Sequence, residues 1–310
     1  MNILVTGGAG FIGSHVVDAY IALGHSVTVL DNLSTGKERN LNPKAAFAKG
    51  DLRDASFVTG VLSGKRFDVV NHHAAQIDVR RSVADPAFDA AVNIVGVLNL
   101  LEACLKNGVG RFIFSSTGGA IYGEQDYFPA DELHPTRPIS PYGIAKLTTE
   151  HYLYYYRIVH GLNSVILRYG NIYGPRQNPE GEAGVVAIFA SRFLAGEQPV
   201  INGDGKQTRD YVFVGDVARA NVDALKYDGS NTFNIGTGIE TDVNRIFNVL
   251  REATGSTRPV QHGEAKKGEQ MRSLLTSEKI RRETGWKAEV SLEEGLRRTV
   301  AYFREVKFRG

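Results

Sequence analysis

A cluster of glycines follows the first apolar segment of the chain directly. Residues 2–6 read NILVT, a short β-branched run, and GGAGFIG then leads into an amphipathic segment over 11–23. Because glycine has no Cβ, such a loop can turn sharply, let a pyrophosphate approach its backbone, and pack a helix closely on a strand. The helix N-terminus also presents unpaired N–H groups to phosphates. The glycine loop therefore predicts a dinucleotide-binding βαβ unit.

The rest of the first half continues the alternation of strands and helices. We expect strands near 26–30, 45–49, 67–71, 111–115 and 164–169, and helices near 55–63, 86–107 and 142–160. Strands separated by helices of this length imply right-handed parallel crossovers. The chain is therefore predicted to be an α/β protein built on a doubly wound parallel sheet.

The second half is less regular and rich in glycine and proline. We expect a helix over 211–226 and a strand over 232–235, both returning to the main sheet. The sequence thus predicts a dinucleotide-binding domain over 1–170 and a smaller, partly interleaved substrate domain over 171–310, of which about 210–236 rejoins the first.

Composition excludes several classes of protein. Of 310 residues 42% are apolar and 23% charged, which excludes a disordered or fibrous chain. The 36 basic and 34 acidic residues show no clustered basic excess, so we expect no nucleic-acid partner. No apolar run approaches the ~20 residues of a bilayer span, so we expect no membrane partner and a cytoplasmic location. The single cysteine, Cys104, excludes an intrachain disulfide and a cysteine-based zinc site.

Two carboxylates end the second and third predicted strands. Asp31 is placed to accept both hydroxyls of an adenosine ribose, and a carboxylate there repels the 2′-phosphate of NADP. No Arg lies directly beside it, although Lys37 and Arg39 follow a few residues later. Asp51 is placed to reach the adenine amino group. The sequence therefore favours NAD as the cofactor.

Tyr142 is the only one of the 13 tyrosines that has a lysine, Lys146, four positions later. On a helix this spacing puts both side chains on one face. An ammonium beside a phenol lowers the phenol pKa from about 10 toward the range of a useful general base. A hydroxyl-rich strand end at 115–117 is predicted at the carboxyl edge of the same sheet. Thr117, Tyr142 and Lys146 beside a bound NAD predict hydride chemistry on an alcohol.

Further motifs accompany this constellation along nearly the whole chain. They are TGGAGFIGSH over 6–15, DNLSTGK over 31–37, GDLRD over 50–54, HHAAQ over 72–76, FIFSSTGGAIYGE over 112–124, SPYGIAK over 140–146, LRYGNIYGPRQ over 167–177, RDYVFVGDVA over 209–218, and the closing GW and SLEEGLRRTV. As a set they make the chain resemble the extended short-chain dehydrogenase/reductase family, and within it the UDP-glucose 4-epimerases.

The resemblance implies a Rossmann fold, tightly held NAD and a UDP-sugar substrate. In such enzymes Tyr142 would take the proton of the sugar C4 hydroxyl while a hydride passes from C4 to NAD. The 4-keto sugar would then rotate and receive the hydride on its other face. Thr117 would share the hydrogen bond to the C4 oxygen, and Lys146 would also hold the nicotinamide ribose.

The resemblance also predicts two sets of binding residues, and no metal site. The cofactor residues are Gly7, Gly10, Phe11, Ile12, Gly13, Asp31, Asn32, Ser34, Thr35, Gly36, Asp51, Leu52, Ala74, Ala75, Gln76, Asn93, Tyr142, Lys146 and Tyr169. The substrate residues are Thr117, Gly118, Gly119, Tyr142, Asn171, Arg209, Lys266, Glu269 and Ser273. The adjacent His72 and His73 lack spaced carboxylates or a third His, so we expect no metal there.

Three positions bear on the substrate. The family's Arg-x-Gly-Asp segment is replaced by KKGE over 266–269, so its bidentate diphosphate contact is lost or moved. Asn202 stands where relatives carry an aromatic that packs on uracil. Ser273 matches a position whose bulk limits the space beside the sugar C2, and its small size predicts that UDP-GlcNAc is accepted along with UDP-glucose.

Three alternative functions are weighed against epimerisation. A dehydratase of this family has an Asp-Glu pair after the Thr, whereas Gly118 and Gly119 follow Thr117 here. A UDP-glucuronate 4-epimerase or a decarboxylase needs a site for the substrate carboxylate, for which we identify no clear candidate. A non-catalytic NAD-binding sensor or scaffold of this fold usually lacks the Tyr–Lys pair.

The resemblance finally implies an assembly. In the family the helices near 86–107 and 142–160 form a four-helix interface, so we expect a homodimer. Four tyrosines at 152 and 154–156 lie on the second of these helices, where we expect them to serve packing.

Overall fold

The computed structural model describes residues 1–180, 184–265 and 270–309, with side chains as far as residue 306. Its centre is a seven-stranded sheet in the order β10-β6-β5-β4-β1-β2-β3, in which all neighbours are parallel. The order changes direction between β1 and β4, and such a switch point opens a crevice at the carboxyl edge. The strands are β1 (Asn2–Thr6), β2 (Ser26–Asp31), β3 (Ala46–Lys49), β4 (Val69–His72), β5 (Arg111–Thr117), β6 (Asn163–Tyr169) and β10 (Asn231–Ile235).

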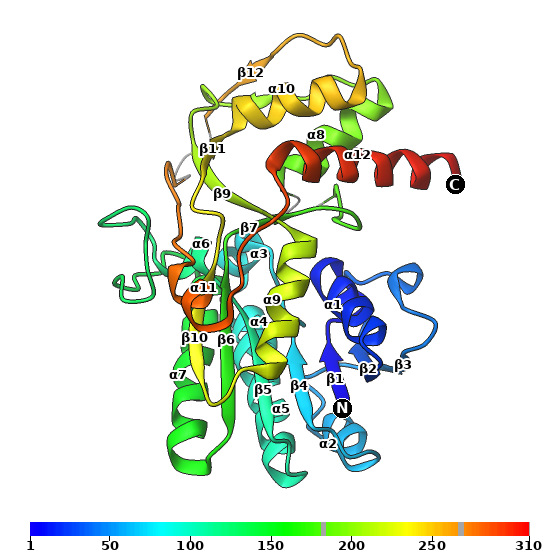
Figure 1. Cartoon of the computed structure of the whole chain (residues 1–310), viewed down its shortest axis with the longest axis vertical. Coiled ribbons are helices and arrows are strands. Elements are labelled where there is room, and N and C mark those ends of the chain that lie inside the picture. Colours follow the sequence, from blue (N-terminus) through cyan, green and yellow to red (C-terminus); the bar gives the residue numbers. More distant parts are fainter. Residues whose placement is uncertain (181–183, 266–269, 310) are drawn as a thin grey trace.

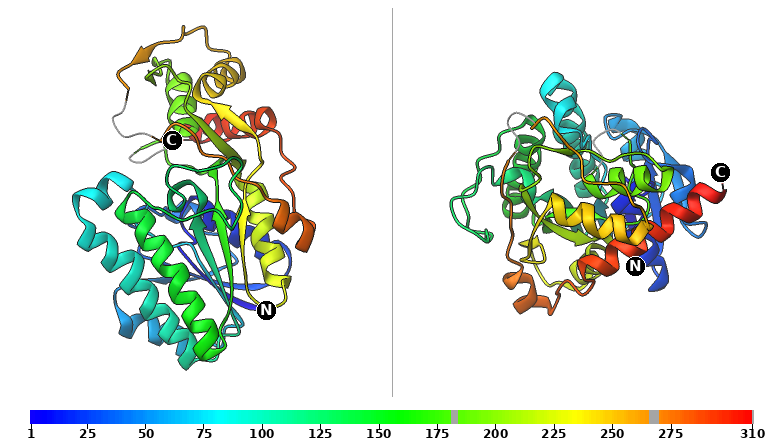
Figure 2. Two further views of the ribbon diagram at one scale, coloured as in Figure 1. Left: turned by 90° about the vertical axis from the view of Figure 1, so that its left-hand side faces the viewer. Right: turned by 90° about the horizontal axis from the view of Figure 1, so that it is seen from above.

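Helices cover both faces of this sheet (Figures 1 and 2). Successive residues of β1 point to opposite faces, so Val5 joins one apolar cluster and Leu4 the other. A strand buried on both faces reads as a continuous apolar run, which explains the sequence NILVT. The first face carries α1 (Phe11–Ala22) and α9 (Val214–Lys226); the second carries α2 (Ala55–Ser63), α5 (Gly96–Lys106) and α7 (Pro141–His160).

A smaller lobe stands above the carboxyl edge of the sheet (Figure 1). Its three-stranded sheet, in the order β11-β9-β7, and three helices enclose a separate apolar core, in which Phe189 and Phe193 contact Phe247 edge-on. The elements are β7 (Asn171–Tyr173), α8 (Val185–Ala195), β9 (Thr208–Phe213), β11 (Glu240–Asp242), α10 (Val243–Thr254), α12 (Leu292–Arg309), and the short pair β8 (Ile201–Asn202) and β12 (His262–Gly263).

One predicted element is partly wrong. The helix expected over 211–226 begins only at Val214, because residues 211–213 belong to β9. All three residues pair with β7. Tyr211 and Phe213 pack in the core of the upper lobe, whereas Val212 joins the apolar cluster of the main sheet that includes α1 and α9. Aromatic and β-branched residues fit a pleated, half-buried surface, so packing decides their conformation here.

The chain crosses between the two lobes more often than we predict. β10 and α9 join the main sheet, and the segment that includes α11 (Glu278–Thr284) returns as well. Ile280 and Trp286 pack in the same cluster as α1 and α9, and Trp286 Nε1 donates to the carbonyl oxygen of Asp216 at 3.0 Å. The division into domains at residue 170 stays a prediction, with this second return added to it.

The longest apolar helix changes one expectation from the sequence. α4 (Pro86–Ala90), the π-helical segment η2 (Ala91–Val95) and α5 form one helix over Pro86–Lys106, with a mean hydropathy of 1.6 in its apolar window. By length and composition it could cross a membrane, so the statement that no apolar run approaches that length was wrong. However, 44% of this window is buried inside the molecule, and helices in the core of a globular protein can have the same length and composition.

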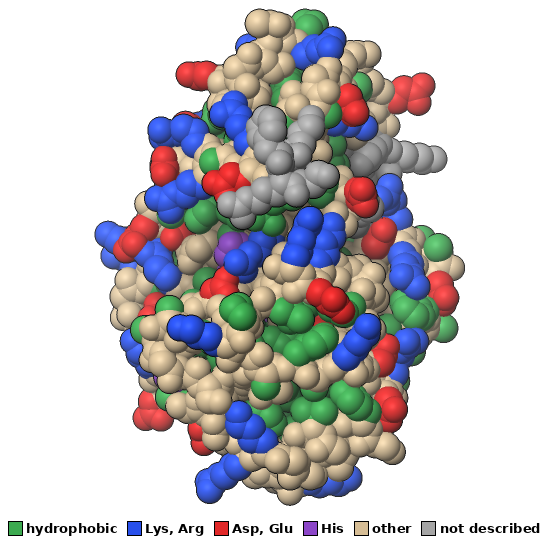
Figure 3. All heavy atoms as spheres, turned by 90° about the vertical axis from the view of Figure 1, so that its right-hand side faces the viewer, with side chains coloured by type: hydrophobic (Ala, Val, Ile, Leu, Met, Phe, Trp, Pro, Cys, Tyr) green, Lys and Arg blue, Asp and Glu red, His purple; other side chains and the backbone are tan. Residues whose placement is uncertain are grey.

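Short helices and mixed charge complete the surface. The short helices are η1 (Glu38–Asn40), α3 (Val79–Ala84) and α6 (Gly118–Ile121). On the side seen in Figure 3, Lys and Arg side chains are interspersed with Asp and Glu side chains and with small apolar areas. This distribution agrees with the near balance of 36 basic and 34 acidic residues.

Candidate active site

The strand ends that we predict to carry the site meet at one edge of the sheet. Thr6, at the end of β1, pairs with Leu30 of β2 and with His72 of β4. Thr117, at the end of β5, pairs with Tyr169 at the end of β6. The glycine loop, the residues after β2 and β4 that we predict to bind the cofactor, and Thr117 therefore share the carboxyl edge where ligands bind in such folds.

The glycine loop is shaped so that side chains cannot replace its hydrogens. Gly7 has φ +70°, and a Cβ there would lie 2.5 Å from the backbone nitrogen of Ala74. A Cβ at Gly13 would lie 2.3 Å from the carbonyl oxygen of Gly7. Gly10 precedes α1, and no described side chain caps this helix. Its first-turn N–H groups, at Phe11 and Ile12, are therefore suited to a phosphate.

Asp31 is fixed by the loops on either side. Its Oδ2 accepts from the backbone nitrogen of Ala9 at 3.0 Å and its Oδ1 from that of Leu33 at 2.8 Å. Burial raises the pKa of Asp31, and these two hydrogen bonds oppose the shift. A Cβ at Gly36 would lie 2.9 Å from Asp31 Oδ1, so the loop over 32–36 folds across the carboxylate. This loop carries the exposed Ser34 and Thr35 and brings them beside Asp31.

Asp51 has protein partners on both of its oxygens. Arg53 forms a bidentate pair with it at 3.0 and 2.9 Å, and Asn32 Nδ2 donates to Oδ2 at 2.9 Å. The Arg53 hydrogen bonds hold the pKa of Asp51 well below its usual range. Leu52 is buried against α5, where a Cβ at Gly96 would lie 3.2 Å from the Leu52 Cβ. These contacts bring Asn32, Asp51 and Leu52 together, whereas their contact with adenine stays a prediction.

The loop Ala74–Gln76 is held by Asn93 of the segment η2. Asn93 Oδ1 accepts from Gln76 N, and Asn93 Nδ2 donates to Gln76 O, each at 2.9 Å. Nδ2 also donates to Asp89 Oδ1 at 2.9 Å. Because these bonds occupy both ends of its amide, Asn93 anchors the cofactor loop in this structure. Sequence reasoning missed Asp89, although its i,i+4 spacing to Asn93 is visible in the motif DPAFDAAVN.

Local capping positions the helix that carries Tyr142 and Lys146. Ser140 Oγ accepts from Gly143 N at 3.1 Å as the cap of α7, and Pro141 takes the first helical position. Tyr142 N donates to Ser82 Oγ at 3.2 Å. Lys146 is buried, and its Nζ donates to the carbonyl oxygen of Ser115 at 2.8 Å. The ammonium is thereby tied to β5 two residues before Thr117.

The electrostatics of this pair differ from the expectation. Lys146 Nζ lies 5.9 Å from the centroid of the Tyr142 ring. Burial lowers the pKa of Lys146 to about 8, whereas burial and then the Asp89 carboxylate raise the pKa of Tyr142 above its usual value. The prediction that Lys146 lowers the pKa of Tyr142 is therefore wrong for the protein without ligands, because desolvation of the phenol dominates.

Two residues predicted to bind the substrate, Thr117 at the end of β5 and Asn171 on β7, lie beside Gly119. A Cβ there would lie 3.8 Å from Thr117 Oγ1 and 3.7 Å from Asn171 Oδ1, so this glycine lies beside both side chains. A Cβ at Gly118 would lie 2.6 Å from Leu275 Cδ1. A side chain at Gly118 would therefore require Leu275 to move, whereas a Cβ at Gly119 would make ordinary contacts.

Arg209 and Ser273 both contact the backbone of Thr208 at the start of β9. Arg209 Nη1 donates to Thr208 O at 2.8 Å, and the buried Ser273 donates its backbone N–H to the same oxygen at 3.2 Å. Asn171 lies on the neighbouring strand β7, where it pairs with Tyr211, two residues beyond Arg209. The structure thus places Arg209 and Ser273 side by side, and Asn171 on the adjacent strand.

The structure does not test three other residues that we expect near the substrate, which are Lys266, Glu269 and Asn202. Lys266 and Glu269, in the segment 266–269, lie outside the described residues. Asn202 lies on β8, where its carbonyl oxygen accepts from Gln207 Nε2 at 3.3 Å. The contacts of these three residues with a nucleotide therefore stay predictions.

His73 is a residue at this edge that sequence reasoning did not assign. Its ring stacks on Tyr169 with centroids 6.4 Å apart, and neither ring nitrogen has a partner among the described residues. Burial lowers the pKa of His73 to about 3, so the ring is neutral at neutral pH. The Tyr169 hydroxyl accepts from Asn221 Nδ2 at 2.9 Å, which leaves the ring face toward His73. Within the described parts of the chain, no group of three or more His, Cys, Asp and Glu is arranged to hold a metal.

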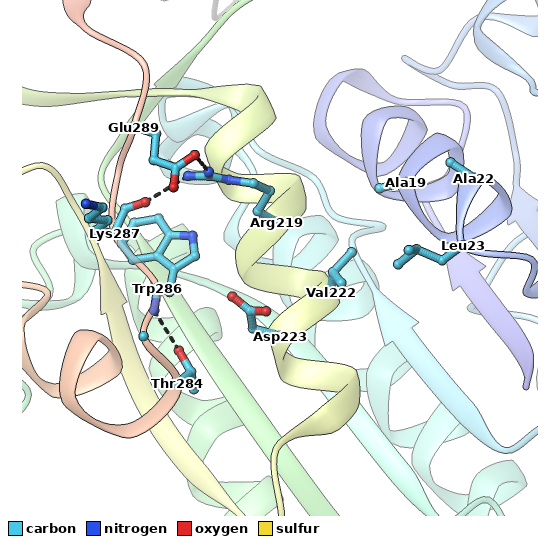
Figure 4. Close-up of a pocket in the computed structure, with 11 residues that line it drawn as sticks. Ala19, Ala22, Leu23, Arg219, Val222, Asp223, Thr284, Trp286, Lys287 and Glu289 are labelled. Atoms are coloured by element: carbon cyan, nitrogen blue, oxygen red, sulfur yellow. Dashed lines mark hydrogen bonds and ion pairs between the residues drawn. The ribbon is translucent and has the colours of Figure 1, made fainter.

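A surface pocket elsewhere contains none of the predicted site residues. It lies between α1, α9 and the segment after α11, and Figure 4 shows Leu23, Val222 and Trp286 on its walls. Arg219 crosses it to pair with Glu289 and donates to Lys287 O at 2.8 Å. The pocket lies on the helical layer beneath the site and not at the carboxyl edge.

The chain is similar to one well-defined group of proteins. The model of the NAD dependent epimerase/dehydratase family matches residues 3–236. The crystal structure of a Thermotoga maritima UDP-glucose 4-epimerase with UDP-glucose is 52% identical, with a TM-score of 0.97, over 99% of this chain and 100% of that chain. A Thermus thermophilus UDP-glucose 4-epimerase complexed with NAD is 47% identical, with a TM-score of 0.93, over 98% and 99%. A Methanobrevibacter ruminantium UDP-N-acetylglucosamine 4-epimerase in complex with UDP-N-acetylmuramic acid is 38% identical, with a TM-score of 0.93, over 98% of both chains.

The substitution Gly13→Ala tests the glycine loop. The added Cβ would meet the Gly7 carbonyl oxygen at 2.3 Å, backbone against backbone, so we expect the purified protein to lose its NAD. Gly60→Ala in α2 is the matched control, because a Cβ there meets nothing within 4 Å and Ala favours a helix by about 1 kcal/mol. NAD released on denaturation is measured per chain. Equal contents in Gly13→Ala and the unaltered protein would contradict this placement of the cofactor.

Proposed function

Because this chain belongs to the NAD-dependent epimerase/dehydratase family, we propose that it is a UDP-glucose 4-epimerase that interconverts UDP-glucose and UDP-galactose with NAD as its cofactor. The observation that carries the proposal is the meeting of Thr117, Tyr142 and Lys146 with the glycine loop at one sheet edge, in a fold that matches epimerases along its full length. When bound, NAD accepts the hydride from C4 of the sugar and returns it to the other face of the transient 4-keto sugar.

The remaining steps, which are cofactor binding, proton transfer and substrate binding, are assigned to residues of the chain. The N–H groups at the start of α1 hold the diphosphate of the dinucleotide, and Asp31 accepts from its adenosine ribose. Tyr142 takes and returns the proton of the sugar C4 hydroxyl, and Thr117 shares the hydrogen bond to the same oxygen. Lys146 holds a positive charge beside them. Asn171 and Arg209 bind the diphosphate of the UDP-sugar.

The geometry after Thr117 favours epimerisation over dehydration. Removal of water from the sugar needs an acid and a base beside C5 and C6, and Gly118 and Gly119 offer neither. A UDP-glucuronate 4-epimerase or a decarboxylase stays the alternative, and a non-catalytic NAD-binding protein is disfavoured by the buried Tyr–Lys pair.

Tyr142→Phe tests the proposed catalyst. Loss of the proton acceptor should reduce the interconversion of UDP-glucose and UDP-galactose by about 10²- to 10⁴-fold while NAD stays bound. Tyr152→Phe, on the same helix but partly exposed, is the control and should retain full turnover. Epimers at C4 are resolved chromatographically after incubation with UDP-glucose, UDP-GlcNAc and UDP-glucuronate. No epimer of the first two from the unaltered protein, with NAD present, would contradict the proposed function.

The proposed substrate range includes UDP-GlcNAc. Ser273 is buried and lies beside Arg209 and Thr208, and its small side chain limits the space beside the sugar least. We expect Ser273→Tyr to lower the rate on UDP-GlcNAc far more than the rate on UDP-glucose, with Ser273→Ala as the control that keeps the ratio. An unchanged ratio in Ser273→Tyr would contradict this role of Ser273.

A homodimer through two helices is also part of the proposal. α7 and the helix over 86–106 lie side by side on the outer face (Figures 1 and 2). Large exposed apolar patches mark interaction sites. On these two helices the apolar side chains that are about half or more exposed are Val95, Ile144, Tyr154, Tyr155, Ile158 and Val159. Tyr156, in contrast, is buried against α5, where its hydroxyl donates to Glu102 Oε1 at 2.5 Å.

Sedimentation tests the dimer. We expect the protein to sediment as a dimer at micromolar concentration, and Ile158→Glu to convert it to a monomer, because a buried unpaired charge costs several kcal/mol. Leu133→Glu is the control, since Leu133 is 89% exposed and belongs to neither helix. A monomeric unaltered protein would contradict the interface. A cytoplasmic location remains part of the same proposal.

A further inference from the structure

A buried carboxylate that the mechanism above does not use lies between the cofactor loop and α7. Asp89 of α4 is 1% exposed, and α4 packs against α7. Its Oδ1 accepts from Gln76 Nε2 and from Asn93 Nδ2, each at 2.9 Å. Both partners are neutral amides, and among the described residues no ion pair involves Asp89. A buried carboxylate without a cation in contact is costly, so its presence calls for a functional account.

The hydrogen bonds of Asp89 close a clamp on the cofactor loop. Gln76 Nε2 also donates to Asp78 O at 2.9 Å, and Gln76 Oε1 accepts from Asp78 N at 2.7 Å. Asn93 binds both backbone groups of Gln76. Asp89 thus orients the side chains of the two residues that fix the loop. The helix is π-helical at Asn93, a local form often found at functional sites.

Asp89 lies on α4, which packs against the helix α7 that carries the buried Lys146, and its charge acts on that ammonium. The other titratable groups around Lys146 are Tyr142 and Glu150 on α7, and His72 and His73 at the end of β4. Both histidines are neutral, because burial lowers the pKa of each. Glu150 already forms a buried ion pair with Arg168 at 2.6 Å. Asp89 is therefore the negative charge left to balance Lys146, and of the two carboxylates it opposes more strongly the effect of burial on the pKa of Lys146.

We propose that Asp89 is a positioning residue for the epimerisation, which holds the cofactor loop through Gln76 and Asn93 and supplies the counter-charge that keeps Lys146 protonated. This inference rests on the proposed function for its catalytic readout. The same carboxylate opposes ionisation of Tyr142, so it sets the pH range in which the pair is active.

The sign of the pH effect follows from removing one negative charge. Without the Asp89 carboxylate the pKa of Lys146 falls, because its charged form loses a stabilising neighbour. The pKa of Tyr142 falls as well, because its phenolate loses a repulsive neighbour. Both limbs of the pH profile of kcat therefore move toward acid. A merely structural defect lowers the profile without moving it.

Asp89→Asn is the test variant, since it removes the charge and keeps the shape and one acceptor. We expect both limbs of its kcat profile to shift to lower pH by about 0.5 to 1 unit. The matched control is Asp85→Asn at the cap of α4, where Asp85 is exposed, accepts from Phe88 N at 3.0 Å, and can be replaced by another good cap residue. Limbs of Asp89→Asn that coincide with those of the unaltered protein would overturn the proposal.

A second readout does not depend on turnover. In protein labelled with ¹³Cε-lysine, the Lys146 resonance is assigned by its loss in Lys146→Met, and its titration is followed in the unaltered protein and in Asp89→Asn. We expect a lower midpoint in the variant, and an equal midpoint overturns the counter-charge. Asp89→Ala, which loses both hydrogen bonds, should in addition retain less NAD than Asp89→Asn; equal retention overturns the clamp. Absence of epimerase activity in the unaltered protein contradicts only the proposed function.

Discussion

The approach of Gly13 to the carbonyl oxygen of Gly7 is the contact on which the site depends. It draws the first turn of α1 against the end of β1, at the point where the strand order changes direction. A Cβ at either glycine would collide with backbone atoms, which cannot move away as a side chain can. The same closeness brings Ala74 and the end of β4 to the loop.

Burial at this edge shifts the pKa values of Lys146 and Tyr142 in opposite directions. It lowers the pKa of Lys146 to about 8 and raises that of Tyr142, so it disfavours both charged forms. Nearby charges determine how much of the free-energy cost of ionising these two buried groups remains. The charge of Glu150 is compensated by Arg168, whereas among the described residues the Asp89 carboxylate accepts from the neutral amides of Gln76 and Asn93 and from no cation. The uncharged side chains at this edge are His72, His73 and Tyr169. The carboxylate that we propose as the counter-charge of Lys146 is Asp89.

The main sheet could be predicted from the sequence because its signals are local. Strands buried on both faces read as apolar runs, and β1 and α2 begin and end where the pattern places them. The upper lobe could not be predicted to the same degree, because its core joins α8, α10 and α12 over long sequence separations. The error over 211–213 has the same origin, since pairing with β7 decides the conformation of these residues.

Some residues of the candidate site could be predicted from the sequence, whereas others could be identified only in the structure. Glycines, Asp31 and the Tyr–Lys spacing are recognisable as motifs, and the structure brings them to one edge. The i,i+4 spacing of Asp89 to Asn93 is visible in the sequence, but the burial of Asp89 and its contact with Gln76 are not, and the burial of His73 has no sequence signal either. The sign of the Tyr142 pKa shift was wrong for the same reason, because spacing reports the presence of Lys146 but not the desolvation of the phenol.

The proposed epimerisation requires that the hydrogen at C4 leave the sugar as a hydride and return to the same carbon. UDP-glucose carrying deuterium at C4 tests it most directly. The protein should convert this substrate to UDP-galactose with the deuterium retained at C4, in ordinary water and without added cofactor. UDP-galactose that has exchanged its label with solvent would contradict the account.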